Sequence, residues 1–503
     1  MTSPADTDTD TDADIAVVGA GPAGLAAAAS ALGAGASVVL LDAGDRAGGQ
    51  YWRHGGAPDL RLYHGWSTFA RLRHRTEPLL RTGHHVQTVV PDAGGWSLTC
   101  VVGDEPARSS VTAVVRARRL VLATGAYDRQ LPFPGWDLPG VMAGGGVQAL
   151  LKSHGVLAGR RVVVAGTGPF LLPVAAGLLA AGARVPLVAE AGSPAGLARH
   201  PRALASSAAK LGEGLGYAAQ LLRHRTPYLR RHAVVRALGA DRLEAVEVAR
   251  LDRRGRVRPG TTRTVACDVL AVGWGFTPRL ELPLQAGCAT AIGADGSLVV
   301  AVDATQATSV AGVWAAGEPT GIGGADLAVV EGRIAGHAAA GAPVPRALLA
   351  RRAALRRFAG ALHAVHPVPR YLVEDLGDDV LACRCEEVPV SAVRDAVREL
   401  GATDARTVKL LTRTGMGWCQ GRVCGAGVAA VTAHACGRAV TETDLGAFTE
   451  RPLAAPATLG LLGGFRPAPA SGPDHPEPAG QLRPAPASGP DHPEPADSCG
   501  RNP

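Results

Sequence analysis

Short apolar runs separated by alanine-rich stretches dominate the first half of the chain. Residues 15–18 and 38–41 are four-residue apolar runs, and the stretch between them is long enough for one helix. Runs that are apolar on both faces are typical of buried parallel strands. The same strand–helix–strand order returns at residues 161–190. The pattern therefore predicts an α/β fold with two parallel-sheet units.

Later segments extend this prediction. Strands are expected near residues 119–123, 267–273 and 308–316, and a glycine-led helix is expected over residues 321–336. Further along, residues 388–400 and 404–411 have the pattern of two short helices, and Pro389 and Gly401 suit the start and end of the first. The chain is thus expected to finish its ordered part in a small, mostly helical domain.

Both ends of the chain differ from this pattern. Residues 1–12 are polar and acidic, and residues 465–503 form a proline-rich tail in which segment 466–479 recurs unchanged at 483–496. Neither composition builds a core, so both ends are expected to be disordered. The first residues lack a basic, apolar leader, and glycines interrupt the apolar stretch at 21–41. We therefore expect a cytoplasmic chain with no membrane span.

Overall charge and cysteine count narrow the possible functions only slightly. The net charge of +7, from 51 basic and 44 acidic residues, is spread over 503 residues and gives no reason to expect nucleic-acid binding. The densest basic run is interpreted as a solvated helix face; it consists of Arg351, Arg352, Arg356 and Arg357. Nine cysteines in an apparently cytosolic chain indicate metal or redox use rather than disulfides.

A glycine fingerprint follows the first apolar run. Gly19, Gly21 and Gly24 form G-x-G-x-x-G between the predicted strand and the helix. They would make the tight turn, let the backbone approach a pyrophosphate, and let helix and strand pack closely. The helix N-terminus then faces the phosphates, and Asp42 ends the second strand where an acid binds ribose hydroxyls. The prediction is dinucleotide binding, and the alternative is an alanine- and glycine-rich packing turn.

A second, imperfect fingerprint lies at Gly166 and Gly168, with Glu190 ending its second strand. Leu171 replaces the third glycine, and Pro173 falls inside the expected helix, where it would disturb the first turns. We interpret Gly166, Gly168 and Glu190 as a candidate NAD site, and the acid favours NAD over NADP. The alternative is a degenerate unit that binds nothing.

Two close cysteine pairs carry the most specific signal. Cys383 and Cys385 form C-x-C, and after 33 residues Cys419 and Cys424 form C-x4-C. Four thiolates can hold zinc or an iron–sulfur cluster, but C-x-C is too tight for the usual zinc knuckle. The alternatives are a zinc site and buried structural thiols.

Residues around the pairs agree with a cluster. Glycines would bring backbone N–H groups near the sulfurs, and arginines would offset negative charge; these are Gly415, Gly417 and Gly421, with Arg384, Arg413 and Arg422. Three other cysteines, Cys100, Cys267 and Cys288, are isolated in apolar surroundings and are expected in the core.

Residues 14 to about 340 resemble the thioredoxin-reductase-like flavoproteins. The resemblance implies FAD at the first fingerprint and a nicotinamide domain inserted into the flavin domain. The redox Cys-x-x-Cys of thioredoxin reductases does not occur in this chain, which excludes a disulfide reductase mechanism. Glu318 stands where the family has an aspartate that contacts the ribityl chain. The implied flavin-site residues also include Gln50, Thr124, Gly125 and Gly317.

The cysteine-containing segment resembles the bacterioferritin-associated-ferredoxin-like 2Fe-2S domain, which implies Cys383, Cys385, Cys419 and Cys424 as cluster ligands. The order of these domains along the chain resembles that of the FAD- and NAD(P)-fold subunits of heteromeric amino-acid dehydrogenases. Examples are the larger flavoprotein subunits of opine oxidase, D-hydroxyproline dehydrogenase and hydrogen cyanide synthase. The implied domains are a flavin domain (13–138 and 280–345), an inserted NAD(P)-binding-like domain (139–279), a helical connector (346–377) and a 2Fe-2S domain (378–445).

The resemblance implies an electron-transferring oxidoreductase subunit, whose partner is a second FAD-containing subunit of the amine-oxidase type. Two alternatives stay open, namely a self-contained NADH-dependent reductase and a non-enzymatic redox-sensing or iron-handling protein. Catalytic residues are not assigned, because no group of residues has the pattern of a general base for an amine. Tyr51, His54 and His64 lie near the flavin loop and are interpreted as packing or surface residues.

Overall fold

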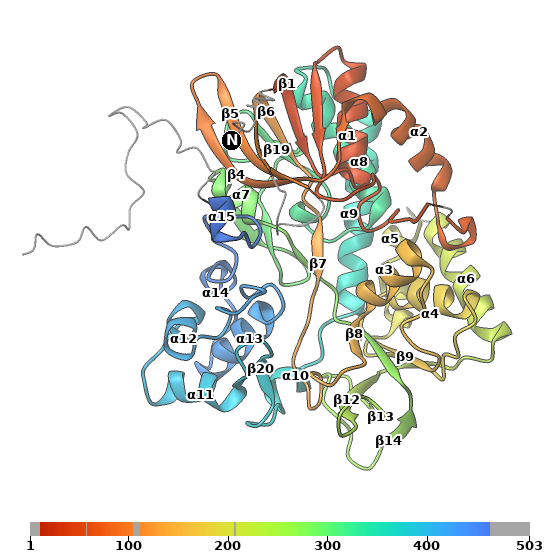
Figure 1. Ribbon diagram of the computed structural model, residues 1–503. Helices are drawn as coiled ribbons and strands as arrows, with labels where there is room; N and C mark the ends of the chain where they lie inside the picture. Colours follow the sequence, from red (N-terminus) through yellow and green to blue (C-terminus); the bar gives the residue numbers. More distant parts are fainter. Residues whose placement is uncertain (1–10, 57, 104–110, 206–207, 463–503) are drawn as a thin grey trace, which may run out of the picture. The chain divides into compact units, whose positions relative to one another are not determined.

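The computed structural model describes residues 11–56, 58–103, 111–205 and 208–462 (Figure 1). The duplicated proline-rich segment and residues 1–10 lie outside this part. Residues 11 and 12 correct the prediction for the N-terminus, because they begin strand β1 (Thr11–Val18) and pair with strand β6 (Val111–Leu122). The ladder to β6 satisfies their backbone polar groups, which outweighs their polar side chains.

The first sheet is built around β1, as the apolar pattern predicts. β1 pairs in parallel with β2 (Val38–Leu41) on one side and with β6 on the other. Ile15, Ala16 and Val17 are completely buried, which is why both faces of this strand are apolar. The strand order is β3-β2-β1-β6-β5-β4, with β19 (Val313–Ala315) also on β6; the other strands are β3 (Leu80–Arg81), β4 (His84–Asp92) and β5 (Gly95–Val102).

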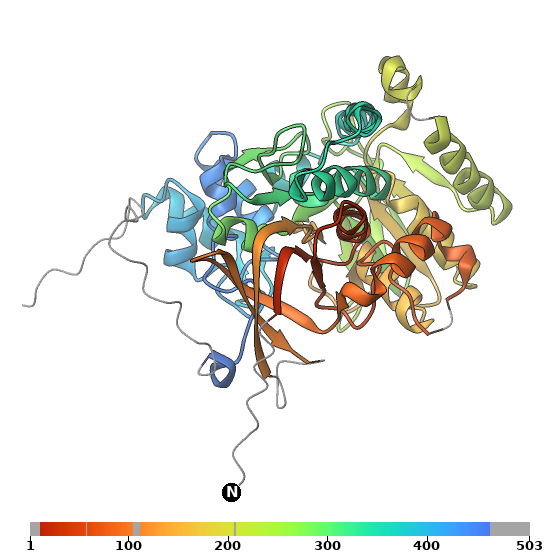
Figure 2. The same cartoon turned by 90° about the horizontal axis from the view of Figure 1, so that it is seen from above.

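Helix α1 (Pro22–Gly33) and helix α8 (Ala325–Ala339) pack on each other over this sheet. Glycines of α8 allow the contact: a Cβ on Gly332 would lie 2.0 Å from the carbonyl oxygen of Ala23. Seen from above, the teal helices α8 and α9 (Arg346–Val365) lie on the side that carries the red helix α1 (Figure 2). The last part of the flavin domain is therefore held against the first fingerprint helix.

The second sheet is parallel, with the order β11-β10-β9-β15-β8. Its central strand β9 (Val162–Gly166) is completely buried over residues 162–165. A three-stranded antiparallel sheet, β12-β13-β14, follows β11 in the chain. The strands are β8 (Val141–Ala143), β10 (Val188–Glu190), β11 (Tyr228–Arg230), β12 (His232–Leu238), β13 (Ala245–Arg250), β14 (Arg263–Ala266) and β15 (Val269–Gly273).

Two antiparallel strands link the sheets where the chain leaves and re-enters the first fold. β7 (Ala126–Asp128) pairs with β16 (Phe276–Pro278), so Tyr127 lies opposite Thr277. Other helices of the chain are α2 (Trp66–Thr76), α3 (Gly144–His154), α4 (Leu171–Ala180), α5 (Pro201–Ala205), α6 (Ala208–Arg223), α7 (Glu281–Gln285) and α15 (Leu459–Leu462). A further pair of strands is β17 (Thr290–Ile292) and β18 (Leu298–Val300).

The cysteine-containing segment folds as a group of short helices, drawn in blue in Figure 1. Both predicted helices form, as α11 (Val390–Arg398) and α12 (Ala405–Thr412), and the Asp404 side chain accepts a hydrogen bond from the Thr407 amide at the start of α12. Trp136 Nε1 donates to the carbonyl oxygen of Leu381 at 2.8 Å, joining this group to the second fold. Its other elements are α13 (Gly425–Ala435), α14 (Glu442–Gly446), β20 (Leu381–Cys383) and β21 (Val388–Pro389).

The basic run on α9 corrects a prediction. Arg351 and Arg357 are exposed as expected, but Arg352 and Arg356 turn toward Glu331 of α8, which is completely buried. A buried carboxylate requires cationic or hydrogen-bonding partners, and the helical spacing of 352 and 356 brings both guanidinium groups to it. Half of the run therefore ties α9 to α8.

These elements confirm the predicted α/β class, with two dinucleotide-binding folds and a small, mostly helical C-terminal domain. The helical connector consists of α9 and α10 (Tyr371–Glu374). Within the described ranges, no helix has both the length and the apolar character needed to cross a bilayer.

Candidate functional site

The first fingerprint is a turn that only glycine can make. Gly19 has a φ of +102°, and a Cβ there would lie 2.3 Å from the carbonyl oxygen of Ala123. A Cβ on Gly24 would lie 1.6 Å from the carbonyl oxygen of Gly19. The turn therefore brings α1 against β1, as the spacing of the glycines predicts.

Backbone alone surrounds the place where a pyrophosphate would approach. The nearest atom to a Cβ on Gly21 would be the Cα of Gly49, at 3.8 Å, and Gly48 donates its N–H to the Ala20 carbonyl oxygen. No side chain caps the N-terminus of α1, which begins at Pro22. Bare N–H groups at a helix start favour an anion.

Asp42 lies at the end of β2 and is partly exposed. Its Oδ1 accepts a hydrogen bond from the Gly44 amide at 2.8 Å, and its Oδ2 accepts one from the Ala20 amide. Burial raises the pKa of this carboxyl, although both hydrogen bonds act in the opposite direction. The carboxylate thus lies beside the fingerprint turn, with part of the residue exposed.

The other implied flavin residues lie at three places. Thr124 and Gly125 follow β6 at the same edge of the sheet as Gly19, and the Thr124 hydroxyl donates to the Arg279 carbonyl oxygen at 2.6 Å. A Cβ on Gly317 would lie 2.9 Å from the Ala23 side chain. Gln50 is exposed and accepts from Arg53 Nε.

Glu318 has turned toward the start of α8. Its carboxylate accepts hydrogen bonds from the Gly323 and Gly324 amides, each at 3.0 Å. Burial raises the pKa of this carboxyl to about 7, against the effect of these two hydrogen bonds. The extra methylene relative to aspartate lets Glu318 reach those amides, and its contact with a ribityl chain stays a prediction.

The second fingerprint differs from the first as the sequence predicts, with one correction. Leu171 is buried at the start of α4, where a glycine would allow closer packing. Helix α4 begins only at Leu171, so Pro173 lies in its first turn and leaves the helix undisturbed. A first-turn N–H has no partner within the helix, so proline is tolerated there. Glu190 ends β10 and is completely buried.

The four predicted ligand cysteines meet at one point. Cys385 Sγ lies 3.8 Å from Cys383 Sγ and 3.9 Å from Cys419 Sγ, and Cys424 contacts both Cys383 and Cys419. Cys383 and Cys424 are buried, whereas Cys385 is exposed. The three isolated cysteines expected in the core are buried, as predicted: Cys100, Cys267 and Cys288.

Hydrogen bonds give two of these thiols thiolate character. Contact with Cys424 lowers the pKa of both Cys383 and Cys419 to about 5. Backbone amides add to this effect, from Gly415 at Cys383 and from Gly421 at Cys419. The same contacts with Cys383 and Cys419 raise the pKa of Cys424, and burial raises the pKa of Cys385 to about 11. Thiolates are the form that binds metal, so two of the four ligands have thiolate character before a cationic centre binds.

The ligand loops also need glycine for packing, which the sequence did not indicate. A Cβ on Gly415, Gly421 or Gly425 would lie within 2.8 Å of the Phe448 side chain, and one on Gly417 would lie 2.6 Å from Cys385 Sγ. Phe448 is 5% exposed and packs directly on the loops. Because Phe448 is far from the cysteines in the sequence, no local pattern predicts this contact.

The predicted arginines have other partners. Arg384 lies over the Trp136 ring at 4.5 Å, and Arg413 pairs with Glu386. Arg422 points away from the sulfurs into the flavin domain. Any offset of cluster charge by these side chains therefore acts over a distance rather than through direct contact.

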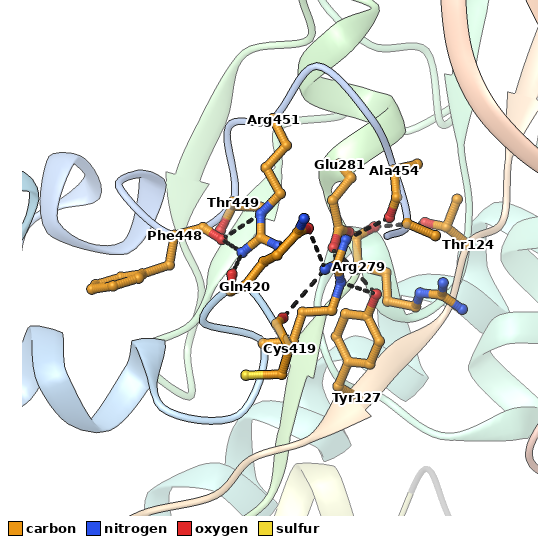
Figure 3. Close-up of polar contacts among 12 residues, drawn as sticks. Thr124, Tyr127, Arg279, Glu281, Cys419, Gln420, Phe448, Thr449, Arg451 and Ala454 are labelled. Atoms are coloured by element: carbon orange, nitrogen blue, oxygen red, sulfur yellow. Dashed lines mark hydrogen bonds and ion pairs between the residues drawn. The ribbon is translucent and has the colours of Figure 1, made fainter. Parts of the chain in front are cut away.

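Arg422 joins the ligand loop to the flavin domain. Its Nε donates to Glu281 Oε1 at 2.9 Å and to the Tyr127 hydroxyl at 3.0 Å. Its Nη2 donates to the Ala454 carbonyl oxygen, and its Nη1 donates to the Cys419 carbonyl oxygen. Figure 3 shows Tyr127, Glu281, Cys419 and Ala454 converging on one place.

A second arginine, Arg451, lies beside Arg422 and also contacts the ligand loop. Arg451 Nε donates to the Phe448 carbonyl oxygen, and its Nη1 donates to Gln420 Oε1 at 3.1 Å (Figure 3). Gln420 has a φ of +51° and also accepts from Arg422. Sequence reasoning missed Tyr127, Glu281 and Arg451, because nothing local distinguishes them from other polar residues.

Tyr51, His54 and His64 are packing residues, as interpreted from the sequence. The His54 ring lies against Trp66 and Phe69, and the His64 ring lies against Tyr217. Tyr51 contacts the Trp52 ring edge-on. None of these contacts suggests a catalytic role.

Comparison with known proteins identifies the families to which two parts of the chain are similar. Residues 13–335 match the pyridine nucleotide-disulphide oxidoreductase family, and residues 381–434 match the BFD-like 2Fe-2S binding domain. Hydrogen cyanide synthase subunit HcnB of Pseudomonas protegens is 35% identical over 67% of this chain and 72% of its own. A subunit of opine oxidase from Agrobacterium tumefaciens is 32% identical over 84% of this chain and 86% of its own.

A solved structure supports the fold. L-proline dehydrogenase from P. horikoshii superposes with a TM-score of 0.64 and 21% identity, covering 91% of this chain and 81% of that chain. At this identity the likeness concerns the fold alone.

The two families imply FAD, NAD(P) and a 2Fe-2S cluster as cofactors. The first fingerprint fits FAD, because its cradle is bare backbone and Asp42 is accessible. The four thiols provide the donors that such a cluster requires. The chain therefore belongs to the pyridine nucleotide-disulphide oxidoreductase family, as an oxidoreductase that also carries a BFD-like 2Fe-2S binding domain.

Proposed function

We propose that this chain is the electron-transferring subunit of a heteromeric amine or imino-acid dehydrogenase of the opine, hydroxyproline or glycine type. Its partner is a second, FAD-containing subunit that oxidises the amine. The names of the relatives support the proposal, because hydrogen cyanide synthase and opine oxidase are both described by subunit.

The cofactors divide between two groups of residues. Gly19, Gly21 and Asp42 bind FAD, and the four clustered cysteines bind the 2Fe-2S cluster. When bound, FAD exchanges electrons in pairs and the cluster exchanges them singly, so one chain can convert between the two modes. The protein supplies position and electrostatics, with backbone N–H groups at both sites.

The observation that carries the proposal is the Arg422 bridge. Arg422 lies between two cluster ligands in sequence, yet its guanidinium contacts Tyr127 and Glu281 of the flavin domain. Tyr127 is two residues beyond Gly125 of the implied flavin pocket. This arrangement fixes the ligand loop against the strand that leaves that pocket, as expected of a relay between two redox groups.

The surface beside the cluster supports a protein partner. The ligand Cys385 is exposed. Two apolar residues just before the ligand Cys419 are exposed as well: Trp418 is 80% exposed and Met416 is 38% exposed. Tryptophan and methionine are enriched at protein interfaces. The partner would thus dock where the cluster is closest to solvent.

A self-contained NADH-dependent reductase is the second candidate. It is favoured by Gly168, because nothing lies within 4 Å of a Cβ placed there and a pyrophosphate could approach. In that case electrons would enter from NADH rather than from a partner subunit.

An anaerobic visible spectrum of the purified chain, before and after one equivalent of NADH, tests the proposal. We expect flavin bands with a broad cluster shoulder, no bleaching by NADH, and bleaching when the amine substrate is added together with the partner subunit. The variant Cys419→Ser should lose the shoulder and keep the flavin bands. Prompt bleaching by NADH alone would favour the reductase, and a missing shoulder would remove the cluster.

A further inference from the structure

The end of helix α9 lies on the edge of the second dinucleotide fold. The Ser193 amide, in the loop after β10, donates to the Val365 carbonyl oxygen at 3.2 Å. The Thr167 hydroxyl, in the fingerprint turn, donates to the Pro367 carbonyl oxygen at 3.4 Å. Between them, His366 Nδ1 lies 3.2 Å from Glu190 Oε1. Three consecutive connector residues thus contact the fingerprint turn and the end of the second strand.

The first fold provides an internal comparison. Asp42 and Glu190 both end the second strand of their unit, and each accepts an amide two residues further on, from Gly44 and Gly192. Asp42 is partly exposed, whereas Glu190 is completely buried. The two acids therefore occupy matching positions, and the difference lies in what covers them.

Glu190 has no free direction left for a ribose. Its carboxylate accepts from the Gly168 amide at 3.0 Å, from the Gly192 amide at 2.7 Å and from the hydroxyls of Thr167 and Tyr228. The His366 side chain, 6% exposed, fills the remaining side, with its Nδ1 close to Glu190 Oε1 but without a hydrogen bond to it. In dinucleotide folds this acid instead accepts from the ribose hydroxyls.

The space beside Glu190 is too small for a sugar. A Cβ added to Gly192 would lie 2.6 Å from the Val365 carbonyl oxygen and 2.8 Å from His366 Nδ1. A Cβ on Gly196 would lie 2.8 Å from Val365 Cγ1. A place that cannot admit one methyl group cannot admit a ribose ring.

We propose that connector residues 365–367 occupy the adenosine-ribose position of the second dinucleotide fold, with the His366 imidazole in place of the ribose hydroxyls. In this state the fold takes neither NADH nor NADPH, although Gly168 still leaves room for a pyrophosphate. The second fold then serves as a scaffold that joins the flavin domain to the cluster domain. The inference does not depend on the proposed partner or substrate.

Equilibrium titration of the FAD-loaded chain with NADH, followed by NADH fluorescence, tests this inference. ADP-ribose serves as a competitor that cannot reduce flavin, so binding is separated from electron transfer. The wild-type chain should show no saturable binding at millimolar NADH. The variant His366→Gly should show saturable binding, with a dissociation constant at least about tenfold below the highest NADH concentration at which wild type shows none, because the ribose can then reach Glu190. Adding Glu190→Gln to it should remove this gain.

The matched control is His154→Gly, which removes an exposed histidine at the end of α3 in the same fold and should leave binding unchanged. Flavin content and melting temperature report whether each variant folds, and His366→Ser replaces His366→Gly if the latter loses its flavin. Saturable NADH binding by wild type that Glu190→Gln abolishes would overturn the inference. So would a folded His366 variant that binds no better than wild type.

Discussion

At the scale of single residues, the most informative contact is the ion pair between Arg422 and Glu281. The two side chains are 12% and 6% exposed, respectively. A buried pair of this kind gains little net stability when formed, but removing one partner strands the other charge. The surface pair of Arg413 and Glu386 is different, because Arg413 is 70% exposed and water screens it.

Replacing Arg422 should therefore cost far more than replacing Arg413. We expect Arg422→Met to lower the free energy of unfolding by about 3 kcal/mol, because Glu281 stays buried without its cation. Arg413→Met should cost less than about 1 kcal/mol. Denaturant unfolding followed by visible absorbance measures both. The double variant with Glu281→Gln should recover part of the loss, and equal effects of the two arginines would contradict this account.

At the scale of elements, glycines decide how closely helices and loops approach. Helix α1 contains two glycines in contrasting surroundings: Gly24 faces the Gly19 carbonyl oxygen, whereas a Cβ on Gly33 would find only the end of Arg75, at 3.5 Å. The first lies at the contact between helix and strand, and the second lies at the far end of the same helix. Only the first position needs glycine for packing.

We expect Gly24→Ala to push α1 away from β1, lowering stability by about 2 kcal/mol or more and lowering the flavin content of the purified chain. Gly33→Ala should be neutral or slightly stabilising, because alanine favours a helix more than glycine does. The ratio of flavin to protein absorbance and the melting temperature check both variants. Full flavin occupancy in Gly24→Ala would refute the proposed role of this glycine in the cradle.

At the scale of the whole described molecule, the cluster domain is joined to both dinucleotide folds. Arg422 contacts the flavin domain, and Trp136, which packs in the same core cluster as strands β9 and β15 of the second fold, donates to Leu381 beside the first ligand pair. The chain after α14 then returns to the first sheet, where the Ala454 amide donates to the Gln87 carbonyl oxygen. The ligand loops are thus held from several directions, while Trp418 stays exposed.

The exposed tryptophan gives a test at this scale. We expect Trp418→Ser to weaken binding of the partner subunit by about thirtyfold, since a tryptophan anchor contributes about 2 kcal/mol or more. Leu222→Ser is the matched control, because Leu222 is 79% exposed on α6, and its replacement should leave affinity unchanged. Surface plasmon resonance with the purified partner measures both. Equal losses, or none, would place the partner elsewhere.

Sequence alone determined the features that depend on local spacing. Buried strands need continuous apolar runs, the fingerprint turn needs glycine at Gly19 and Gly24, and two close cysteine pairs identify the ligands of the proposed cluster. The helix start at Leu171 could not be predicted, because the turn before it depends on Gly273 of a distant strand.

Only the tertiary structure decided the contacts between residues far apart in the chain. It brings Phe448 onto three ligand-loop glycines, Arg422 onto Glu281, and His366 onto Glu190. Each pair joins different elements, and their packing sets the distance between side chains that no periodicity relates. The sequence therefore predicted which dinucleotide fingerprints are present, and the packing of the connector decided which of them can still be reached by a ribose.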